Sequence, residues 1–261
     1  MRIEDALRSA LIRLSRGVVV TRRLPSDLGS AALRVSPEAS LTYWFGLRTR
    51  KFRDLFDFAR RHVRLGDRVW DVGVNMGAFS FAAAHCSGSS GRVLGFEPDW
   101  WSCQLLQRSR QRNPALAERL EVLPVAISDA MALLTLKIPE RGRAAAHLEL
   151  AGEGAGREIT GGTRNRFLVP AVTLDWVAQS QGPPDVIKID VDGAELRVLL
   201  GGMGLLRSKR PRLLVEVHER NADAVGALLD DCGYRLYSYE HGEEASQPIS
   251  RPSYNTLALP A

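Results

Sequence analysis

The sequence predicts an α/β fold built on a mostly parallel sheet with helices on both faces. Short apolar runs of strand length alternate with stretches of helical periodicity along most of the chain. The run at residues 69–72 breaks into a glycine turn followed by a helix, which is the nucleotide-binding unit of doubly wound folds. A second apolar run, residues 185–189, ends in acidic residues, as expected where strands deliver side chains to a site.

Length and composition favour one main domain. The chain has 261 residues, 45% of them hydrophobic, which is enough for one sizeable core. We divide it into residues 1–45, a basic amphipathic helix with a linker, and residues 46–261, the α/β domain. Three cysteines without Cys-x-x-Cys spacing argue against a disulfide framework or a zinc site and favour a reducing compartment. The sequence shows neither an apolar run of membrane-spanning length nor a signal peptide, so we expect a cytoplasmic protein.

Positive charge is concentrated at the N-terminus. Residues 1–68 carry 15 Lys and Arg side chains against 7 Asp and Glu, whereas the remaining residues carry 20 against 23. Such a segment could contact nucleic acid or anionic lipid. Because 31 of the 35 basic residues are Arg, a compositional bias that leaves a solvated basic face is the favoured explanation.

The N-terminal segment is predicted to be an appendage. Apolar residues at helical spacing predict a helix over residues 3–20. Packing on the domain is its favoured role, and the alternatives are pairing with a second copy in a homo-oligomer and weak contact with a membrane surface. Residues 21–40 contain proline and glycine and are interpreted as a linker, so residues 1–40 are predicted to be dispensable for folding. A second helix is predicted over residues 50–63.

The glycine turn after the first core strand has the features of a cofactor site. Gly73 lets the backbone turn sharply, and Gly77 lets the start of the next helix approach a ligand closely. The turn is neither Gly-x-Gly-x-x-Gly nor a P-loop, so it indicates no pyrophosphate cradle. Asp71 would repel a phosphate and suits a cationic or amino group. Glu97 ends the next strand, twenty residues after Gly77, and has the reach to accept hydrogen bonds from both ribose hydroxyls.

A nucleoside with an amino-acid arm and no phosphate fits these residues, which points to S-adenosylmethionine. A helix over residues 99–112 and a third strand over residues 120–125 follow. The side chains of Ser128 and Asp129, after that strand, could bind the adenine amino group, and a turn or helix cap is the alternative. Two further strands flank residues 139–166, which are rich in Gly, Ala and Arg and are predicted to form a mobile excursion over the site.

The second acidic stretch places ionisable groups at the end of a buried strand. Strand alternation puts Lys188 and Asp190 on the same side. A lysine inside an apolar strand needs a partner because its desolvation is costly, so a structural Lys–carboxylate pair is one interpretation. In the other interpretation Asp190 lies beside the transferable methyl group, and Asp192 and Glu195 help to line the acceptor pocket.

The C-terminal third completes the predicted sheet. Residues 212–217 form the fifth core strand, and His218 follows at the edge where a general base would lie, with a helix cap as the alternative. A helix over residues 221–231 precedes strands over residues 234–239 and 254–259. These last two strands are joined by a polar loop and predict a hairpin with one antiparallel strand.

Taken together, these stretches resemble the FkbM family of S-adenosylmethionine-dependent methyltransferases. The matching segments are Trp70-Asp-Val-Gly-Val-Asn-Met-Gly77, Phe96-Glu-Pro98, Ala126-Ile-Ser-Asp129, Thr173-Leu-Asp175, Ile187-Lys-Ile-Asp-Val-Asp-Gly-Ala-Glu195 and Glu216-Val-His218. They occur in family order between about residues 50 and 260, and the first 45 residues fall outside the resemblance. One departure is Asp192, where the family usually has Glu.

The resemblance implies a Rossmann-like class I methyltransferase fold with a seven-stranded, mostly parallel sheet and an antiparallel C-terminal hairpin strand. It also implies methyl transfer from S-adenosylmethionine to a hydroxyl of a sugar or secondary metabolite, so the expected partner is a small-molecule or glycan acceptor. The cofactor-binding residues expected from the motifs are Asp71, Gly73, Asn75, Gly77, Glu97, Ser128, Asp129 and Asp190.

The expected reaction is in-line attack of an acceptor oxygen on the sulfonium methyl group, with most of the rate supplied by positioning. An unactivated hydroxyl needs a base, for which the candidates are Asp190, His218 and, if burial lowers its pKa, Lys188. Alternatively, a magnesium ion held by Asp190, Asp192 and Glu216 would lower the pKa of the hydroxyl, as in related sugar methyltransferases.

Three other functions stay open from the sequence. A nucleic-acid or protein methyltransferase would use the basic N-terminal segment, although the fourth strand lacks the Asn-Pro-Pro-Tyr type of motif that holds a flipped base, which disfavours nucleic acid as a partner. A nicotinamide enzyme would need a different glycine spacing. A non-catalytic S-adenosylmethionine-binding protein would keep the fold and lose the site, yet each predicted cofactor position carries a suitable residue.

Overall fold

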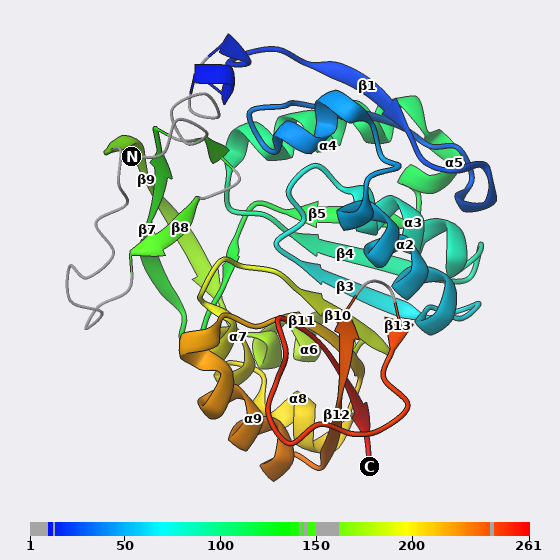
Figure 1. The fold of residues 1–261 in the computed structure, drawn as a ribbon, viewed down its shortest axis with the longest axis vertical. Helices are drawn as coiled ribbons and strands as arrows, with labels where there is room; N and C mark the ends of the chain where they lie inside the picture. The colour runs from blue at the N-terminus through cyan, green and yellow to red at the C-terminus, as the bar shows by residue number, and fades with distance from the viewer. Residues whose placement is uncertain (1–9, 13, 141, 144–145, 150–161, 241–242) are drawn as a thin grey trace.

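The computed structural model describes residues 10–12, 14–140, 142–143, 146–149, 162–240 and 243–261. Its central sheet has the strand order β13-β12-β14-β11-β10-β3-β4-β5 (Figure 1). These strands are β3 (Arg68–Val72), β4 (Arg92–Phe96), β5 (Leu120–Leu123), β10 (Val186–Ile189), β11 (Arg212–Glu216), β12 (Tyr234–Glu240), β13 (Glu243–Glu244) and β14 (Asn255–Pro260). The two-residue β13 pairs only with the edge strand β12, so seven strands span the sheet.

The strand directions confirm the predicted fold class. The neighbours from β11 to β5 pair in parallel, whereas β14 is antiparallel to both β11 and β12. The chain leaves β3 toward β4 on one side of the sheet and later returns to β10 on the other side of β3. The order of the strands therefore reverses between β3 and β10, and open α/β sheets bind their ligands beyond the carboxyl ends of the strands at such a point.

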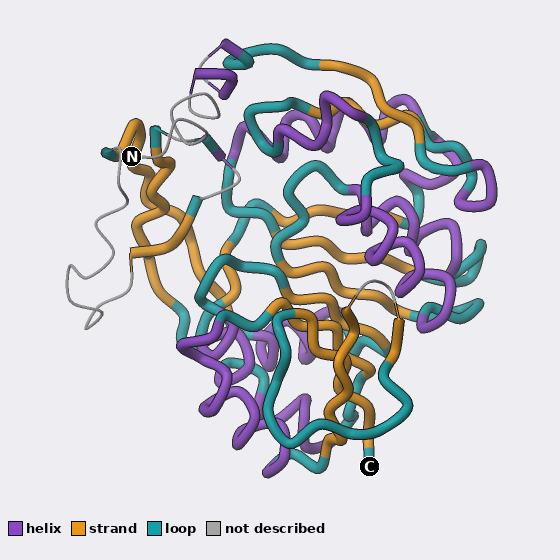
Figure 2. The backbone as a smooth tube through the Cα atoms, in the orientation of Figure 1, coloured by secondary structure: helices purple, strands orange, loops and turns teal. Residues whose placement is uncertain are grey.

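Helices cover both faces of the sheet because successive strand residues point to opposite sides (Figure 2). On one face, Val69 and Val93 join a core with the helices α2 to α5, and on the other, Trp70 and Leu94 join a core with α6 to α9. The helices are α2 (Arg50–His62), α3 (Ala78–Cys86), α4 (Trp100–Arg112), α5 (Pro114–Ala117), α6 (Leu174–Gln181), α7 (Glu195–Leu200), α8 (Met203–Ser208) and α9 (Ala222–Asp231). In the described part of the chain, no helix has the length and apolar character needed to cross a bilayer.

The linker predicted for residues 21–40 is wrong, because this segment contributes to the core. It contains β1 (Val20–Arg23), the 3-10 helix η1 (Ser26–Leu28) and β2 (Ala32–Val35), and a second 3-10 helix, η2 (Leu41–Phe45), follows. Leu28 and Leu33 are fully buried in the core that also contains α2 and α3. The backbone N–H of Arg34 donates to Ser109 Oγ of α4 at 2.8 Å, and Figure 1 shows β1 arching over that helix. Proline and glycine here mark turns of a packed hairpin rather than a free connection.

The helix predicted for residues 3–20 is only partly within the described residues. Residues 10–12 and 14 are helical, and β1 has begun by Val20, so the helix ends earlier than predicted. Ile12 is buried, whereas Leu14 is exposed, so one side of this segment packs on the domain. The division of the chain at residue 45 stays a prediction, although buried residues on both sides of it share one core.

A second, smaller sheet stands beside the central one, to its left in Figure 1. Its order is β6-β9-β7-β8, with β6 (Ala126–Ile127), β7 (Ala132–Pro139), β8 (His147–Glu149) and β9 (Thr163–Val172). The sequence predicts strands at β7 and β9 but not their separation into a sheet with its own core. Most of the predicted excursion, residues 139–166, lies within or between these strands, and residues 150–161 lie outside the described part.

Candidate active site

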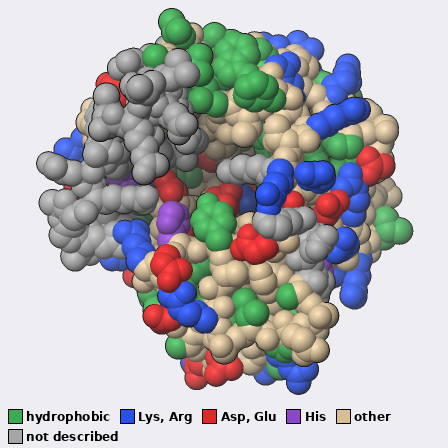
Figure 3. Space-filling view, viewed as in Figure 1, with side chains coloured by type: hydrophobic (Ala, Val, Ile, Leu, Met, Phe, Trp, Pro, Cys, Tyr) green, Lys and Arg blue, Asp and Glu red, His purple; other side chains and the backbone are tan. Residues whose placement is uncertain are grey.

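One cleft opens at the carboxyl ends of β3, β4 and β10. Its empty volume, including the part open to solvent, is about 1190 Å³, so it can hold a ligand of cofactor size. Besides the strand ends, its lining includes Tyr43 before α2, Arg143 between β7 and β8, and His147 in β8. The face shown in Figure 3 is hollowed near its centre, and acidic side chains gather around the hollow.

The glycine turn after β3 is shaped by close contact with β10. Gly73 has a φ of 83°, and a Cβ atom on it would lie 1.9 Å from the backbone oxygen of Asp190, so only glycine fits. Asn75 follows with a φ of 55°, in the left-handed region that asparagine tolerates better than most residues. Gly77, with a φ of 85°, caps the start of α3. Gly73 and Asn75 line the cleft, whereas Gly77 shapes the turn from outside the lining.

Glu97 joins this turn to the end of β4. Its two carboxylate oxygens accept hydrogen bonds from the backbone N–H groups of Asn75, at 2.7 Å, and Asp99, at 2.9 Å. The side chain is buried yet lines the cleft, and its burial raises the pKa of the carboxyl to about 8. In the ionised form, each oxygen of Glu97 has a second lone pair, so the carboxylate can accept hydrogen bonds from two ligand hydroxyls.

The raised pKa of Glu97 predicts a pH-dependent stability. Between its ordinary pKa of 4.5 and the folded value of about 8, the folded protein holds a proton that the unfolded chain has lost. The stabilisation is therefore complete below about pH 4.5 and is lost as the pH rises through about 8, with a slope of at most about 1.4 kcal/mol per pH unit. Urea unfolding between pH 5 and 8.5 should show the wild type losing stability relative to Glu97→Gln, and parallel curves would contradict the prediction.

Lys188 forms a buried ion cluster beneath the cleft. Its Nζ lies 3.3 Å from Asp71 Oδ1 and 3.4 Å from Asp190 Oδ2, and it donates a hydrogen bond to the backbone oxygen of Gly73 at 3.0 Å. Burial alone would lower the pKa of Lys188, but the charges of Asp71 and Asp190 outweigh it and raise the pKa above its ordinary value. Lys188 would act as a base only if its pKa were lowered, and its surroundings raise the pKa instead.

Asp71 lies deeper than the sequence suggests. It is fully buried, does not line the cleft, and accepts a hydrogen bond from Ser80 Oγ at 2.5 Å. Burial raises its pKa, and the neighbouring charge of Lys188 opposes that rise. Asp71 thus pairs with Lys188 and with Ser80 of α3, which supports the structural interpretation of the lysine–carboxylate pair, and its role as a cofactor-binding residue stays a prediction.

Two pairs of polar side chains lie beyond Asp190, whose own side chain lines the cleft and is 27% exposed. Asp192 lines the cleft, and its Oδ1 lies 3.3 Å from Nε2 of His218. Tyr254 donates a hydrogen bond from its hydroxyl to Glu216, and its ring lies edge-on to the imidazole of His218 at 6.3 Å. His218 and Asp190 both follow parallel strands of the central sheet, β11 and β10, at their carboxyl ends.

The remaining predicted acidic residues are engaged elsewhere. Glu195 is buried and accepts hydrogen bonds from Gly193 N–H at 2.6 Å and from Asn221 Nδ2 at 2.8 Å, so it stabilises the turn before α7 and does not line the cleft. Ser128 and Asp129 also lie outside the cleft lining. Ser128 donates to Asp129, whose carboxylate pairs with Arg197 of α7 at 3.2 Å, and the preceding residues 125–127 line the cleft instead.

The magnesium site considered at Asp190, Asp192 and Glu216 does not form. The three carboxylates face different partners, which are Lys188, His218 and Tyr254 respectively. Within the described residues, no group of three or more His, Cys, Asp or Glu side chains is arranged to hold a metal ion. The arrangement of these donors does not fit a magnesium ion.

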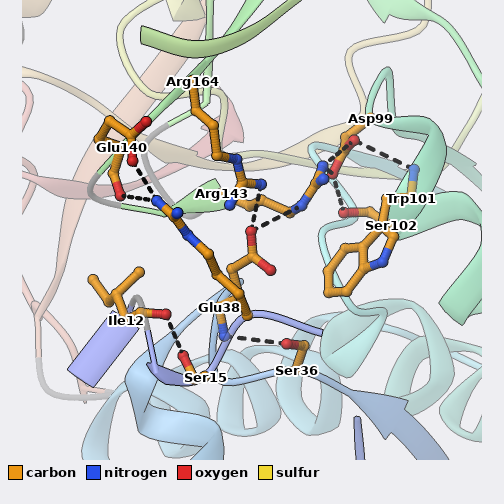
Figure 4. Close-up of polar contacts among 11 residues, drawn as sticks. Ile12, Ser15, Ser36, Glu38, Asp99, Trp101, Ser102, Glu140, Arg143 and Arg164 are labelled. Atoms are coloured by element: carbon orange, nitrogen blue, oxygen red, sulfur yellow. Dashed lines mark hydrogen bonds and ion pairs between the residues drawn. The ribbon is translucent and has the colours of Figure 1, made fainter. Parts of the chain in front are cut away.

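A buried ion cluster that the sequence does not reveal closes one side of the cleft (Figure 4). Arg143 Nη1 contacts both carboxylate oxygens of Asp99 at 2.6 Å, and its Nε lies 3.3 Å from Oε1 of Glu38. Arg164 pairs with the same oxygen of Glu38 at 2.5 Å, and the guanidinium of Arg143 lies 4.6 Å from the centroid of the Trp101 ring. These charged side chains are only 4–17% exposed. The cluster ties the segment after β2, the start of α4 and the small sheet together.

Substitution of Arg143 tests this cluster. Arg143→Met should lower the free energy of unfolding by about 2 kcal/mol, less than the roughly 3–5 kcal/mol for a broken buried pair because Arg164 still neutralises Glu38. The matched control is Arg207→Met, which removes an exposed partner of Asp231 and should cost less than about 1 kcal/mol. Chemical denaturation measures both, and equal losses in the two variants would show that the cluster adds no more than a surface pair.

Comparisons with known proteins agree with the fold and with the motifs. Residues 71–236 match the sequence model of the methyltransferase FkbM domain. Among solved structures, methyltransferase FkbM from Methylobacillus flagellatus aligns with a TM-score of 0.52 and 13% identity. The alignment covers 98% of this chain and 59% of that one, so this chain spans about three fifths of its length.

A looser alignment is found with an S-adenosylmethionine-dependent O-methyltransferase from Thermotoga maritima, at a TM-score of 0.47 and 15% identity over 80% of this chain and 64% of the other. Because both identities are low, these likenesses bear on the fold alone, and only the first is close enough to support it. A search of curated proteins gives no significant match.

Proposed function

This chain belongs to the methyltransferase FkbM domain family, and on that premise we propose that it transfers the methyl group of S-adenosylmethionine to a hydroxyl of a small-molecule or glycan acceptor. The observation that carries the proposal is the joint placement of the Gly73 turn and the Glu97 carboxylate in one cleft at the reversal of strand order. The family and this cleft support the methyltransferase assignment, while the hydroxyl acceptor is our inference.

The residues of the cleft fit the proposed cofactor. Glu97 in its ionised form has lone pairs for two ribose hydroxyls, and Gly73, Val74 and Asn75 of the turn line the same cleft, where an amino-acid arm would meet them. Residues 125–127, in place of Ser128 and Asp129, would border the adenine. Bound S-adenosylmethionine supplies an electrophilic methyl group on a positively charged sulfur.

In the proposed reaction, Asp190 removes the proton from the acceptor hydroxyl. Asp190 lines the cleft directly after β10 and is 27% exposed, so both a substrate and solvent can reach it. Lys188 keeps its proton and holds Asp190 in place through the ion pair. His218, with its imidazole beside Asp192, is the second candidate base. The cleft walls contribute mainly by orienting the two substrates.

Calorimetry with S-adenosylhomocysteine tests the cofactor assignment. The wild type should bind it, and Glu97→Ala should weaken binding by roughly 1–3 kcal/mol because hydrogen bonds to the ribose are lost. Glu121→Ala, which removes an exposed carboxylate from neighbouring β5, is the matched control and should leave the affinity unchanged. If the wild type did not bind S-adenosylhomocysteine, the proposed function would be wrong.

A further inference from the structure

A second cavity adjoins the cofactor cleft at Asp190. Asp190 and Leu55 line both cavities, and the second is otherwise bounded by α2 and by the ends of β11, β12 and β14. Its empty volume, open solvent included, is about 840 Å³, which leaves room for a ring-sized molecule. A molecule bound there would lie against the residue that we propose as the base.

The lining of this cavity is strongly acidic. Its described lining residues include four carboxylates and one cation: Asp54, Asp190, Glu216, Glu240 and Arg50. Burial, the hydrogen bond to Glu216 and the charge of Asp190 together raise the pKa of the Tyr254 hydroxyl, which is the response expected in a negative field. An acceptor bearing a carboxylate or phosphate would be repelled from such a cavity, whereas a cationic group would be attracted.

The carboxylates that line the cavity differ in their hydrogen-bond partners. Glu240 Oε1 accepts the backbone N–H of Asn255 at 3.1 Å, and Glu216 accepts the hydroxyl of Tyr254. Oδ1 of Asp54 is buried and accepts no hydrogen bond from the described residues. Burial raises the pKa of Asp54, the charges of Arg50 and Arg53 oppose that rise, and those of Asp57 and Glu240 add to it. Of these two carboxylates, Glu240 lines the cavity together with Asp54. An ammonium group has three donors and could bridge such a pair.

Apolar surface faces the same space. Leu55, Leu214 and the rings of Tyr239 and Tyr254 line the cavity together with the carboxylates. Aromatic rings bind both the C–H face of a saturated ring and a nearby cation. Acidic groups around apolar walls therefore suit a compact hydroxylated ring that carries positive charge.

We propose that this second cavity is the acceptor subsite and that it takes a hydroxylated ring bearing a protonated amine, which Asp54 and Glu240 bind while a ring hydroxyl faces Asp190. The assignment rests on the methyl transfer proposed above and adds the chemical class of the acceptor. It places recognition of the amine on α2 and β12, away from the groups that hold the cofactor.

Binding of small sugars to the full chain saturated with S-adenosylhomocysteine tests the subsite. Competition measured by NMR at pH 6.5, where roughly all of the amine is protonated, compares glucosamine with glucose, N-acetylglucosamine and glucuronate. Glucosamine should bind at least about 10-fold more tightly than glucose or N-acetylglucosamine, because one added ion pair in a partly desolvated site is worth about that factor. Glucuronate should bind most weakly.

Two variants and a control test which residues cause the preference for glucosamine over glucose. Asp54→Asn and Glu240→Gln should each reduce the affinity for glucosamine about 5-fold or more, and change the affinity for glucose less than about 2-fold. Asp57→Asn removes a carboxylate from the same helix that pairs with Arg60 at 2.6 Å outside the cavity, and it should leave the preference intact. None of the three should alter binding of S-adenosylhomocysteine.

The outcomes separate this inference from the function on which it rests. Equal affinities for glucosamine and glucose, or no detectable binding of any sugar, would overturn the amine subsite while binding of S-adenosylhomocysteine persists. Loss of preference in Asp57→Asn as well would overturn it too, because a diffuse surface charge would then explain the preference. Failure of the wild type to bind S-adenosylhomocysteine would instead remove the proposed function.

Discussion

We expect Asp190→Asn to lower turnover by about 100-fold or more while the affinity for S-adenosylhomocysteine changes little. The carboxamide occupies the same volume but cannot accept the hydroxyl proton, and a lost general base typically costs between about 100- and 10,000-fold. Cofactor affinity should persist because Glu97 and the glycine turn do not depend on the charge of residue 190. Single-turnover kinetics beside calorimetry separate the two effects.

Comparison with His218 makes the test specific. His218→Gln removes the imidazole near Asp192 and should reduce turnover much less if Asp190 is the base. Near-normal turnover in Asp190→Asn would instead make Asp190 a structural partner of Lys188, and His218 would become the base. A chelator should leave the activity of the wild type unchanged, since the three carboxylates considered for a metal face other groups.

Deletion of residues 1–40 should abolish cooperative unfolding, or lower the stability by most of its total. The deletion removes both strands of the N-terminal hairpin, including the fully buried Leu28 and Leu33. It also removes the backbone partners of Ser109 in α4 and of Asn113, which directly follows that helix. Each large apolar side chain contributes roughly 1.5–3 kcal/mol when buried, against a typical total stability of about 5–15 kcal/mol. Thermal unfolding followed by circular dichroism measures the result.

Two point substitutions test whether the buried side chains, and not merely the shortening of the chain, account for the effect of the deletion. Leu33→Ala removes a side chain that is 0% exposed and should cost about 2–5 kcal/mol. Leu65→Ala alters a leucine that is 82% exposed and should cost less than about 0.5 kcal/mol. A truncated chain that melts like the wild type would restore the interpretation of this segment as an appendage, as the sequence suggests.

The parts of the site that are encoded locally are predictable from sequence. The Gly73 turn is recognisable because a strand, a backbone conformation that favours glycine and a helix follow each other within a dozen residues. Glu97 is recognisable because the end of the second strand in such a unit meets the same cleft. The central sheet follows from apolar runs whose order is characteristic of the class.

The parts that depend on distant segments are not predictable in this way. One ion cluster forms where the N-terminal hairpin, α4 and the small sheet come into contact, and it contains Glu38, Asp99, Arg143 and Arg164. No residue spacing in the sequence predicts that these segments are in contact. The ion pair between Asp129 and Arg197 is hidden for the same reason, because the two residues lie 68 positions apart. Proline and glycine are ambiguous signals, since they occur in free linkers and in packed hairpins alike.

The position of β3 in the sheet also constrains how the chain can fold during synthesis. On one side β3 pairs with β4, which follows soon after it, but on the other side Val69 pairs with Val186 of β10. Until β10 has left the ribosome, one edge of the apolar strand β3 has no partner strand. That edge could pair with a strand of another chain. Non-local pairing of this kind also slows folding. Slower synthesis at low temperature and chaperones that cover strand edges should therefore raise the yield of native protein.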